Sequence, residues 1–174
     1  MKIAIISDVH NNEVNLKKVL DYCKRENIKT IICCGDMASK ETLDFMNDNF
    51  SGNILYTFGN ADYDDLRSLE DEKKYRNTYI FKKFGEAVIE KKNVSFIHYP
   101  REAESLGRTG KYNFVFYGHT HKPWITSAKS PENEGREYTL LNPGNVAGEI
   151  YPPTFAVWNT ENDHFDLIRV HDLN

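Results

Sequence analysis

Two histidines, His119 and His121, follow an aromatic and β-branched run in the segment Phe-Tyr-Gly-His-Thr-His at residues 116–121. In an extended segment, side chains alternate between the two faces, so these two imidazoles would point to the same side. Imidazole is a common ligand of zinc and other first-row metals. The pair therefore suggests half of a metal site, although two ordinary loop histidines explain an isolated pair equally well.

Other polar side chains follow predicted strands at the points where apolar runs stop. They are Asp8 and His10 after the first run, Asp36 after the second, Asn60 after the third and His98 after a later one. Strand ends are the usual place for chemistry in an α/β fold. Each residue alone has a plain explanation as a helix cap, a turn residue or a buried histidine. Together with the segment that ends in His119 and His121, five separate segments end in such residues, which favours one shared site.

Apolar runs and helical patterns alternate in the first third of the chain. We expect strands at residues 3–6, 30–34 and 54–58, with an amphipathic helix after each of the first two. Asn11 or Asn12 would cap the first helix, and Ser39 precedes the second. This order of elements is typical of β-α-β units, which build a parallel sheet with helices outside.

Short strands separated by turns dominate the rest of the chain. The pattern predicts an antiparallel meander over residues 79–84, 86–90 and 94–98, a strand at 114–117, and hairpins over 124–141 and 154–170. Residues 62–77 are interpreted as a short exposed helix or loop, and residues 102–106 as a helical turn. The whole predicts one domain over residues 1–174, an α/β fold built as a four-layer α/β/β/α two-sheet sandwich with the metal site at its strand ends.

Composition narrows the class of protein. The chain has 174 residues, of which 40% are hydrophobic and 28% charged, as in an ordinary globular protein. Its net charge of −4 argues against a general nucleic-acid binder. Three cysteines without CxxC spacing argue against a disulfide framework or a thiolate zinc site. The apolar run at the start is too short for a signal peptide or a membrane span, so we expect a cytoplasmic protein.

Taken in order, the motifs resemble those of the calcineurin-like metallophosphoesterases. The likeness covers nearly the whole chain and runs through Asp8-x-His10, Gly35-Asp36, Gly59-Asn60, His98, Gly118-His119-x-His121 and residues 141–144. By its short length, the chain most resembles the small prokaryotic phosphodiesterase branch, which the eukaryotic retromer scaffold subunit also resembles. The motif set is specific for the superfamily and says little about the substrate.

The resemblance implies a site for two divalent metal ions. Asp8, His10 and His121 would hold one ion, Asn60, His98 and His119 the other, and Asp36 would bridge them. Ligands without thiolate suit Mn²⁺ first, with Ni²⁺, Fe²⁺, Co²⁺ and Zn²⁺ as alternatives. A bridging hydroxide would attack phosphorus in line, with catalytic roles for Asp36, Asn60 and His98. Two ions less two carboxylates and one hydroxide leave a charge of about +1, which complements a phosphodiester.

The expected function is a metal-dependent phosphodiesterase that acts on a small or nucleotide-like phosphodiester. Two alternatives stay open, a phosphomonoesterase and a metal-binding scaffold protein with little activity. A nuclease is disfavoured because no basic groove with interleaved aromatic residues is visible. The sequence leaves the physiological substrate, the native metal and the oligomeric state open.

One position departs from the family pattern. Ala61 follows Asn60 where many members have a histidine, which is thought to stabilise the transition state or protonate the leaving oxygen. General-acid catalysis contributes roughly 10²–10⁴-fold, so its loss would slow the enzyme or restrict it to good leaving groups. Tyr99, Arg101 and Asp62 are the candidates to compensate.

Overall fold

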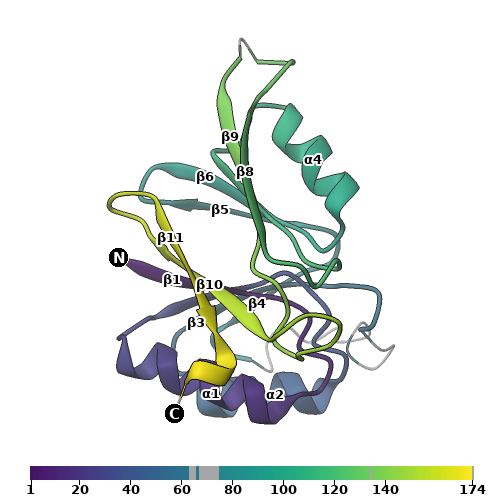
Figure 1. Ribbon diagram of the computed structural model, residues 1–174, viewed down its shortest axis with the longest axis vertical. Coiled ribbons are helices and arrows are strands. Elements are labelled where there is room, and N and C mark those ends of the chain that lie inside the picture. Colours follow the sequence, from purple (N-terminus) through teal and green to yellow (C-terminus); the bar gives the residue numbers. More distant parts are fainter. Residues whose placement is uncertain (63–65, 67–74, 134, 174) are drawn as a thin grey trace.

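The computed structural model describes residues 1–62, 66, 75–133 and 135–173, and two sheets packed face to face form its centre (Figure 1). The first sheet has the strand order β11-β10-β1-β2-β3-β4. Its strands are β1 (Lys2–Ile6), β2 (Thr30–Cys33), β3 (Asn53–Thr57), β4 (Thr78–Phe81), β10 (Thr154–Asn159) and β11 (His164–Arg169). Strands β1 to β4 are parallel, and β10 and β11 form the predicted closing hairpin. Strand β10 pairs antiparallel with β1.

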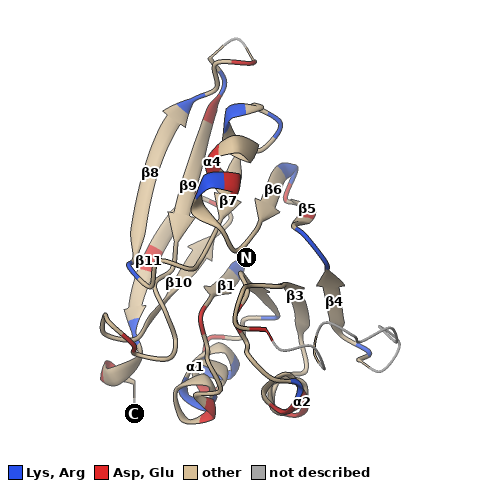
Figure 2. Ribbon diagram, turned by 90° about the vertical axis from the view of Figure 1, so that its right-hand side faces the viewer, with Lys and Arg blue, Asp and Glu red and all other residues tan. Residues whose placement is uncertain are grey.

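The second sheet has the order β5-β6-β7-β9-β8 and carries one helix on its outer face (Figure 2). Its strands are β5 (Gly85–Ile89), β6 (Lys92–Phe96), β7 (Phe114–Phe116), β8 (Trp124–Lys129) and β9 (Glu137–Asn142). Strands β6, β7 and β9 are parallel, whereas β5 and β8 pair antiparallel with their neighbours. The segments that follow the parallel strands of each sheet therefore all begin at the same edge of that sheet.

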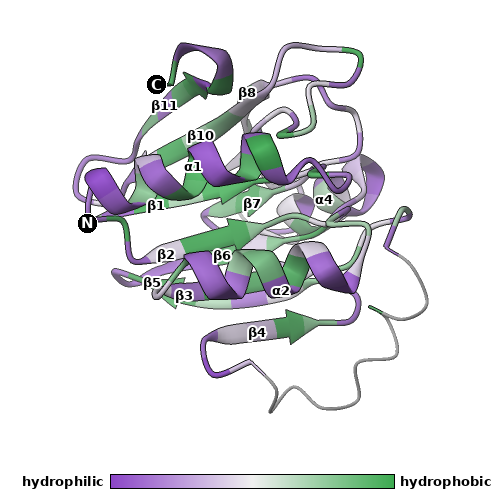
Figure 3. Ribbon diagram, turned by 90° about the horizontal axis from the view of Figure 1, so that it is seen from below, coloured by the Kyte–Doolittle hydropathy of each residue, from purple (hydrophilic) through white to green (hydrophobic). Residues whose placement is uncertain are grey.

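Helices α1 (Glu13–Arg25) and α2 (Lys40–Asn49) cover the outer face of the first sheet (Figure 3). Helix α1 buries Leu16, Val19, Leu20 and Cys23, which share one face at helical spacing. Its cap is Asn12, whose side chain accepts from the Asn15 N–H at 3.0 Å, and Ser39 caps α2 in the same way. Asp8 and Asp36 therefore cap neither helix.

Between the sheets lies a core of large apolar side chains, which include Ile5, Ile32, Phe96, Phe116 and Trp158. A separate cluster packs α4 (Pro100–Arg108) against β7 and β9. With α1 and α2 on the far side, the four layers are α/β/β/α, which confirms the predicted fold class. A turn of 3₁₀ helix, η2 (Val170–Asp172), follows β11.

Two predicted elements were wrong in detail. Strand β4 does not join a meander with β5 and β6 but pairs parallel with β3 in the first sheet. Parallel pairing needs a crossover of a dozen residues or more, and residues 58–77 are long enough to supply it. The predicted exposed segment at residues 62–77 lies mostly outside the described residues.

The predicted turn at residues 102–106 is the nine-residue helix α4. Pro100 stands at its first turn, where a missing N–H costs nothing, and Ala103 and Gly107 are buried against the sheet. Among the described residues, no helix combines the length and apolar character needed to cross a membrane. All three cysteines are buried free thiols.

Candidate metal centre

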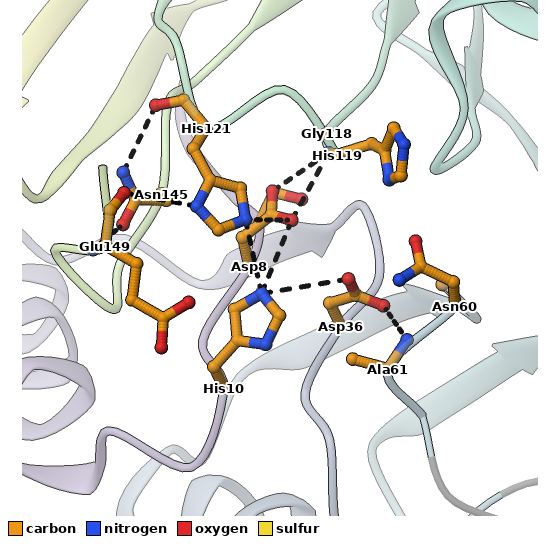
Figure 4. Close-up of polar contacts among 12 residues, drawn as sticks. Asp8, His10, Asp36, Asn60, Ala61, Gly118, His119, His121, Asn145 and Glu149 are labelled. Atoms are coloured by element: carbon orange, nitrogen blue, oxygen red, sulfur yellow. Dashed lines mark hydrogen bonds and ion pairs between the residues drawn. The ribbon is translucent and has the colours of Figure 1, made fainter. Parts of the chain in front are cut away.

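The seven residues predicted as metal ligands all follow the carboxyl ends of parallel strands. Asp8 and His10 follow β1, Asp36 follows β2, Asn60 follows β3, His98 follows β6, and His119 and His121 follow β7. Figure 4 shows side chains from both sheets meeting at this edge. The two remaining histidines, His164 and His171, are exposed, as predicted.

Asp8, His10 and His121 form the first group of candidate ligands, with ligand atoms all within 4.8 Å of one another. The His121 Nε2 lies 3.3 Å from Asp8 Oδ1 and 3.3 Å from His10 Nε2. His10 Nε2 lies 3.8 Å from Asp8 Oδ1. In Figure 4, the two imidazoles point toward one another beside the carboxylate. Two ring nitrogens and a carboxylate oxygen facing one space fit a transition-metal ion.

Asp8, Asp36 and His98 form a second group within the same 4.8 Å limit. Asp36 Oδ2 lies 3.2 Å from His98 Nε2 and 3.7 Å from His10 Nε2, so this carboxylate faces both groups. Asp8 also belongs to both groups. The Asn60 Oδ1 lies 3.1 Å from His98 Nε2. The His119 Nδ1 lies 3.3 Å from the same nitrogen.

Backbone carbonyls orient two of the imidazoles. The His98 Nδ1 lies 2.8 Å from the Cys34 carbonyl oxygen, and His121 Nδ1 lies 3.2 Å from that of Glu149. If each Nδ1–H donates to its carbonyl, the Nε2 atom is left as an acceptor that faces the carboxylates. Such outer partners fix the tautomer and ring orientation of metal-ligating histidines.

The backbone at five of the seven candidate ligands is in the left-handed region. These residues are Asp8 (φ 55°), His10 (46°), Asp36 (57°), His119 (70°) and His121 (59°). The prediction that His119 and His121 lie on one side of an extended segment was therefore wrong. The chain bends there, and the two rings serve different groups, with His121 beside Asp8 and His119 beside His98. Left-handed non-glycine residues cluster at functional sites, where surrounding structure holds them in place.

A glycine precedes three of the candidate ligands, and close packing requires all three glycines. A Cβ on Gly35 would lie 2.7 Å from His98 Nδ1. A Cβ on Gly59 would lie 2.1 Å from Asp36 Oδ1, and one on Gly118 would lie 1.9 Å from Ser7 Oγ. The Gly118 backbone thereby lies against the end of β1, and the His119 N–H donates to Asp8 Oδ2 at 3.1 Å. The Gly-Asn and Gly-His dipeptides are thus the sequence signal of close contact between strand ends.

Two asparagines that were not among the predicted site residues hold the His119–His121 segment. Asn142 Nδ2 donates to the Gly118 carbonyl at 2.8 Å, and Asn145 Nδ2 donates to the His121 carbonyl at 3.1 Å. Both asparagines are buried. Asn142 ends β9 and Asn145 follows it, and because β9 is parallel to β7, both lie beside the segment that they support.

Asp62 supports the site instead of supplying an acid. Its buried carboxylate accepts from the N–H groups of Gly59 at 2.6 Å, Ala38 at 3.0 Å and Asp36 at 3.2 Å. It therefore joins the loops after β2 and β3. Of the other two candidates, Arg101 is exposed on α4, whereas the Tyr99 ring packs against those of His98 and His119, with centroids 5.1 Å and 5.5 Å away.

We expect Asp62→Asn to destabilise the metal-free protein by about 1–3 kcal/mol, because an amide N–H₂ would face backbone donors and leave one of them without an acceptor. Urea unfolding measures the change. Asp166→Asn, on the exposed face of β11, is the control. Equal midpoints for the two variants would contradict the supporting role.

The carboxylates and imidazoles of the site shift one another's pKa values. Burial would raise the pKa of Asp8, but hydrogen bonds with His10 and His121 outweigh it and hold that pKa well below its usual value. The hydrogen bond with Asp8 raises the pKa of both His10 and His121. Burial opposes the charged form of His98, yet the neighbouring Asp36 raises its pKa as well.

These shifts give metal binding an expected pH dependence. Protons must leave the imidazoles before an ion binds, and a raised pKa keeps them in place to a higher pH. The apparent Mn²⁺ affinity should therefore fall as pH is lowered from 8 to 6, by about tenfold per pH unit for each proton displaced. Calorimetric titration in buffers of different ionisation enthalpy counts the protons. Binding heats that do not depend on the buffer would contradict this expectation.

The α/β/β/α sandwich and the ligand groups at its strand ends define a metallohydrolase. Residues 1–163 match the calcineurin-like phosphoesterase superfamily domain. The chain belongs to this family, which confirms the resemblance of the motifs and makes the protein a metallophosphoesterase, a hydrolase.

Individual relatives agree with this assignment. The chain is 29% identical to the phosphodiesterase MJ0936 of Methanocaldococcus jannaschii over 168 residues, which cover 95% of this chain and 96% of that one. The structure of an archaeal phosphodiesterase is similar with a TM-score of 0.81 and 28% identity, covering 97% of this chain and 99% of that one. YfcE, a phosphoesterase from E. coli, shares the fold with a TM-score of 0.66 and 16% identity over 98% of this chain and 100% of its own.

Proposed function

We propose that the protein is a phosphodiesterase that uses two divalent metal ions, Mn²⁺ first among them, to hydrolyse a small or nucleotide-like phosphodiester. The observation that carries this proposal is the arrangement of two ligand groups around the carboxylates of Asp8 and Asp36. When bound, two ions would polarise the phosphoryl oxygens and lower the pKa of a water between them.

The seven candidate ligands would be divided between the two ions. Asp8, His10 and His121 would hold one ion, and Asn60, His98 and His119 the other, with Asp36 shared between them. The carboxylates of Asp8 and Asp36 bring two negative charges, so two ions and a hydroxide leave about +1 to attract one phosphodiester charge. The hydrogen bond between His98 Nδ1 and the Cys34 carbonyl would keep the Nε2 atom directed at the ion that it shares with Asn60 and His119.

We assign Tyr99 a role in substrate binding beside the candidate ligands His98 and His119. Its ring lies against His98 and His119 and is only partly buried. A phenolic hydroxyl there would bind the ester rather than hold an ion. We also assign the protein to the cytoplasm, since its three cysteines remain buried free thiols.

Hydrolysis of matched chromogenic esters tests the proposal. Metal-stripped protein refilled with Mn²⁺ should hydrolyse bis(4-nitrophenyl) phosphate with a higher kcat/KM than 4-nitrophenyl phosphate, and a chelator should abolish both activities. A higher kcat/KM for the monoester would make the protein a phosphomonoesterase. Tight Mn²⁺ binding without turnover of either ester would favour a scaffold protein with little activity.

A further inference from the structure

A pocket of about 550 Å³ opens beside the candidate ligands Asn60 and His98. It lies between the end of β3, the connection from β4 to β5, and helix α4. Gly59 and Tyr99 line it, and they are the chain neighbours of Asn60 and His98. The Tyr99 ring, which lines the pocket, also contacts the imidazoles of His98 and His119, with centroids 5.1 Å and 5.5 Å away.

The walls of this pocket are mainly apolar and partly aromatic. Phe58, Phe84, Ile97 and Leu106 line it together with Tyr99. All but the buried Ile97 are only partly buried, so apolar surface remains uncovered within the pocket. Wide aromatic and aliphatic walls beside a polar centre are typical of a site that binds a ring.

Charged side chains stand at the mouth of the pocket. Lys82 and Lys83 form the blue connection between β4 and β5 in Figure 2, and Glu102 faces the pocket from α4. All three side chains are exposed. Thr57 Oγ1 donates to the Lys83 carbonyl at 3.2 Å, which fixes this connection to the end of β3. Two positive charges against one negative charge favour the approach of an anionic ester.

The geometry points to this pocket as the subsite for one ester arm of the substrate, and the arm that it fits is a planar aromatic ring. The inference rests on the proposed phosphodiester chemistry of the neighbouring metal centre. A phosphoryl group at that centre would place one of its ester oxygens next to Tyr99, and a ring on that oxygen would enter the pocket. The ring is either a simple aryl group or a nucleobase, since both present the same flat apolar faces.

Binding of three phosphonate monoesters to the Mn²⁺-loaded protein tests the inference. The methyl, phenyl and thymidine 5′ esters of methylphosphonate share one reacting group and one negative charge, and differ only in the arm. Calorimetric titration gives each Kd without requiring turnover. Ser105 lines the pocket from the exposed side of α4, so Ser105→Trp fills it without touching a candidate ligand. Glu104→Trp places the same side chain on α4 away from the pocket and is the matched control.

In the wild type, the phenyl ester should bind about tenfold more tightly than the methyl ester, because its ring is removed from water. Ser105→Trp should reduce this ratio to about one, and Glu104→Trp should retain it. A thymidine ester that binds more tightly than the phenyl ester, with the preference lost in Ser105→Trp, identifies the ring as a nucleobase. The reverse order identifies a simple aryl arm.

Equal affinity for the methyl and phenyl esters in the wild type would overturn the subsite, as would an unchanged ratio in Ser105→Trp. This failure is separate from failure of the proposed function. Diester turnover without a ring preference removes the subsite alone, whereas a ring preference without turnover of any diester removes the phosphodiesterase function and leaves the pocket.

Discussion

Asp36→Asn should lower phosphodiester turnover by about 10³-fold or more, since loss of a shared metal ligand removes several kcal/mol of transition-state stabilisation. The Asp36 carboxylate lies 3.2 Å from His98 Nε2 and 3.7 Å from His10 Nε2, and thus faces candidate ligands of both ions. Asparagine keeps the shape and the oxygen that accepts from the Ala61 N–H at 2.7 Å. The fold should therefore survive while the shared negative charge is lost.

Turnover of bis(4-nitrophenyl) phosphate and the number of Mn²⁺ ions bound per chain measure this effect together. The variant should bind fewer ions or bind them more weakly. Asp48→Asn, on the exposed side of α2, removes the same charge away from the site and should match the wild type. Wild-type turnover in Asp36→Asn would rule out the shared role of this carboxylate.

Ala61→His is the variant with the second largest expected effect, and it should raise activity. The Ala61 side chain is partly exposed, and the residue is held beside the site because its N–H donates to Asp36 Oδ1. An imidazole there could protonate the leaving oxygen. For esters with poor leaving groups, kcat should rise by about 10²-fold, at the lower end of the usual range for general-acid catalysis.

Comparison of leaving groups separates acid catalysis from simple contact with the substrate. A 4-nitrophenolate ion leaves without a proton, so its release should change little, whereas release of an unsubstituted phenol should be much faster. Ala61→Phe adds a ring without a titratable nitrogen and should give no gain. An equal gain for both leaving groups, or a gain in Ala61→Phe, would contradict the role of a proton donor.

Much of this fold could be predicted because its strands and helices have distinct local patterns. Residues 3–6 form an unbroken apolar run, and the structure buries all of them in the middle of a sheet. Leu16, Val19 and Leu20 repeat at helical spacing and form the buried face of α1. The candidate ligands could be found because they follow such strands, and because a glycine directly precedes three of them, Asp36, Asn60 and His119.

What could not be predicted depends on contacts between distant segments. Strand β4 is short, and only its neighbours in space decide which sheet it joins. Asp62 could be a loop acid or a buried acceptor, and the choice depends on three N–H groups that converge on it from two loops. The opposite directions of His119 and His121 follow from positive φ angles, which histidine adopts only when its surroundings hold it there.

The candidate ligands come from both sheets, and the chain separates the first from the last by more than 100 residues, from Asp8 to His121. Neither of the two groups of candidate ligands can therefore assemble within one hairpin or one β-α-β unit. Asp8 and His121 meet only where the two sheets are docked. Any ion held there would act as a cross-link between the two sheets and would stabilise their docked arrangement.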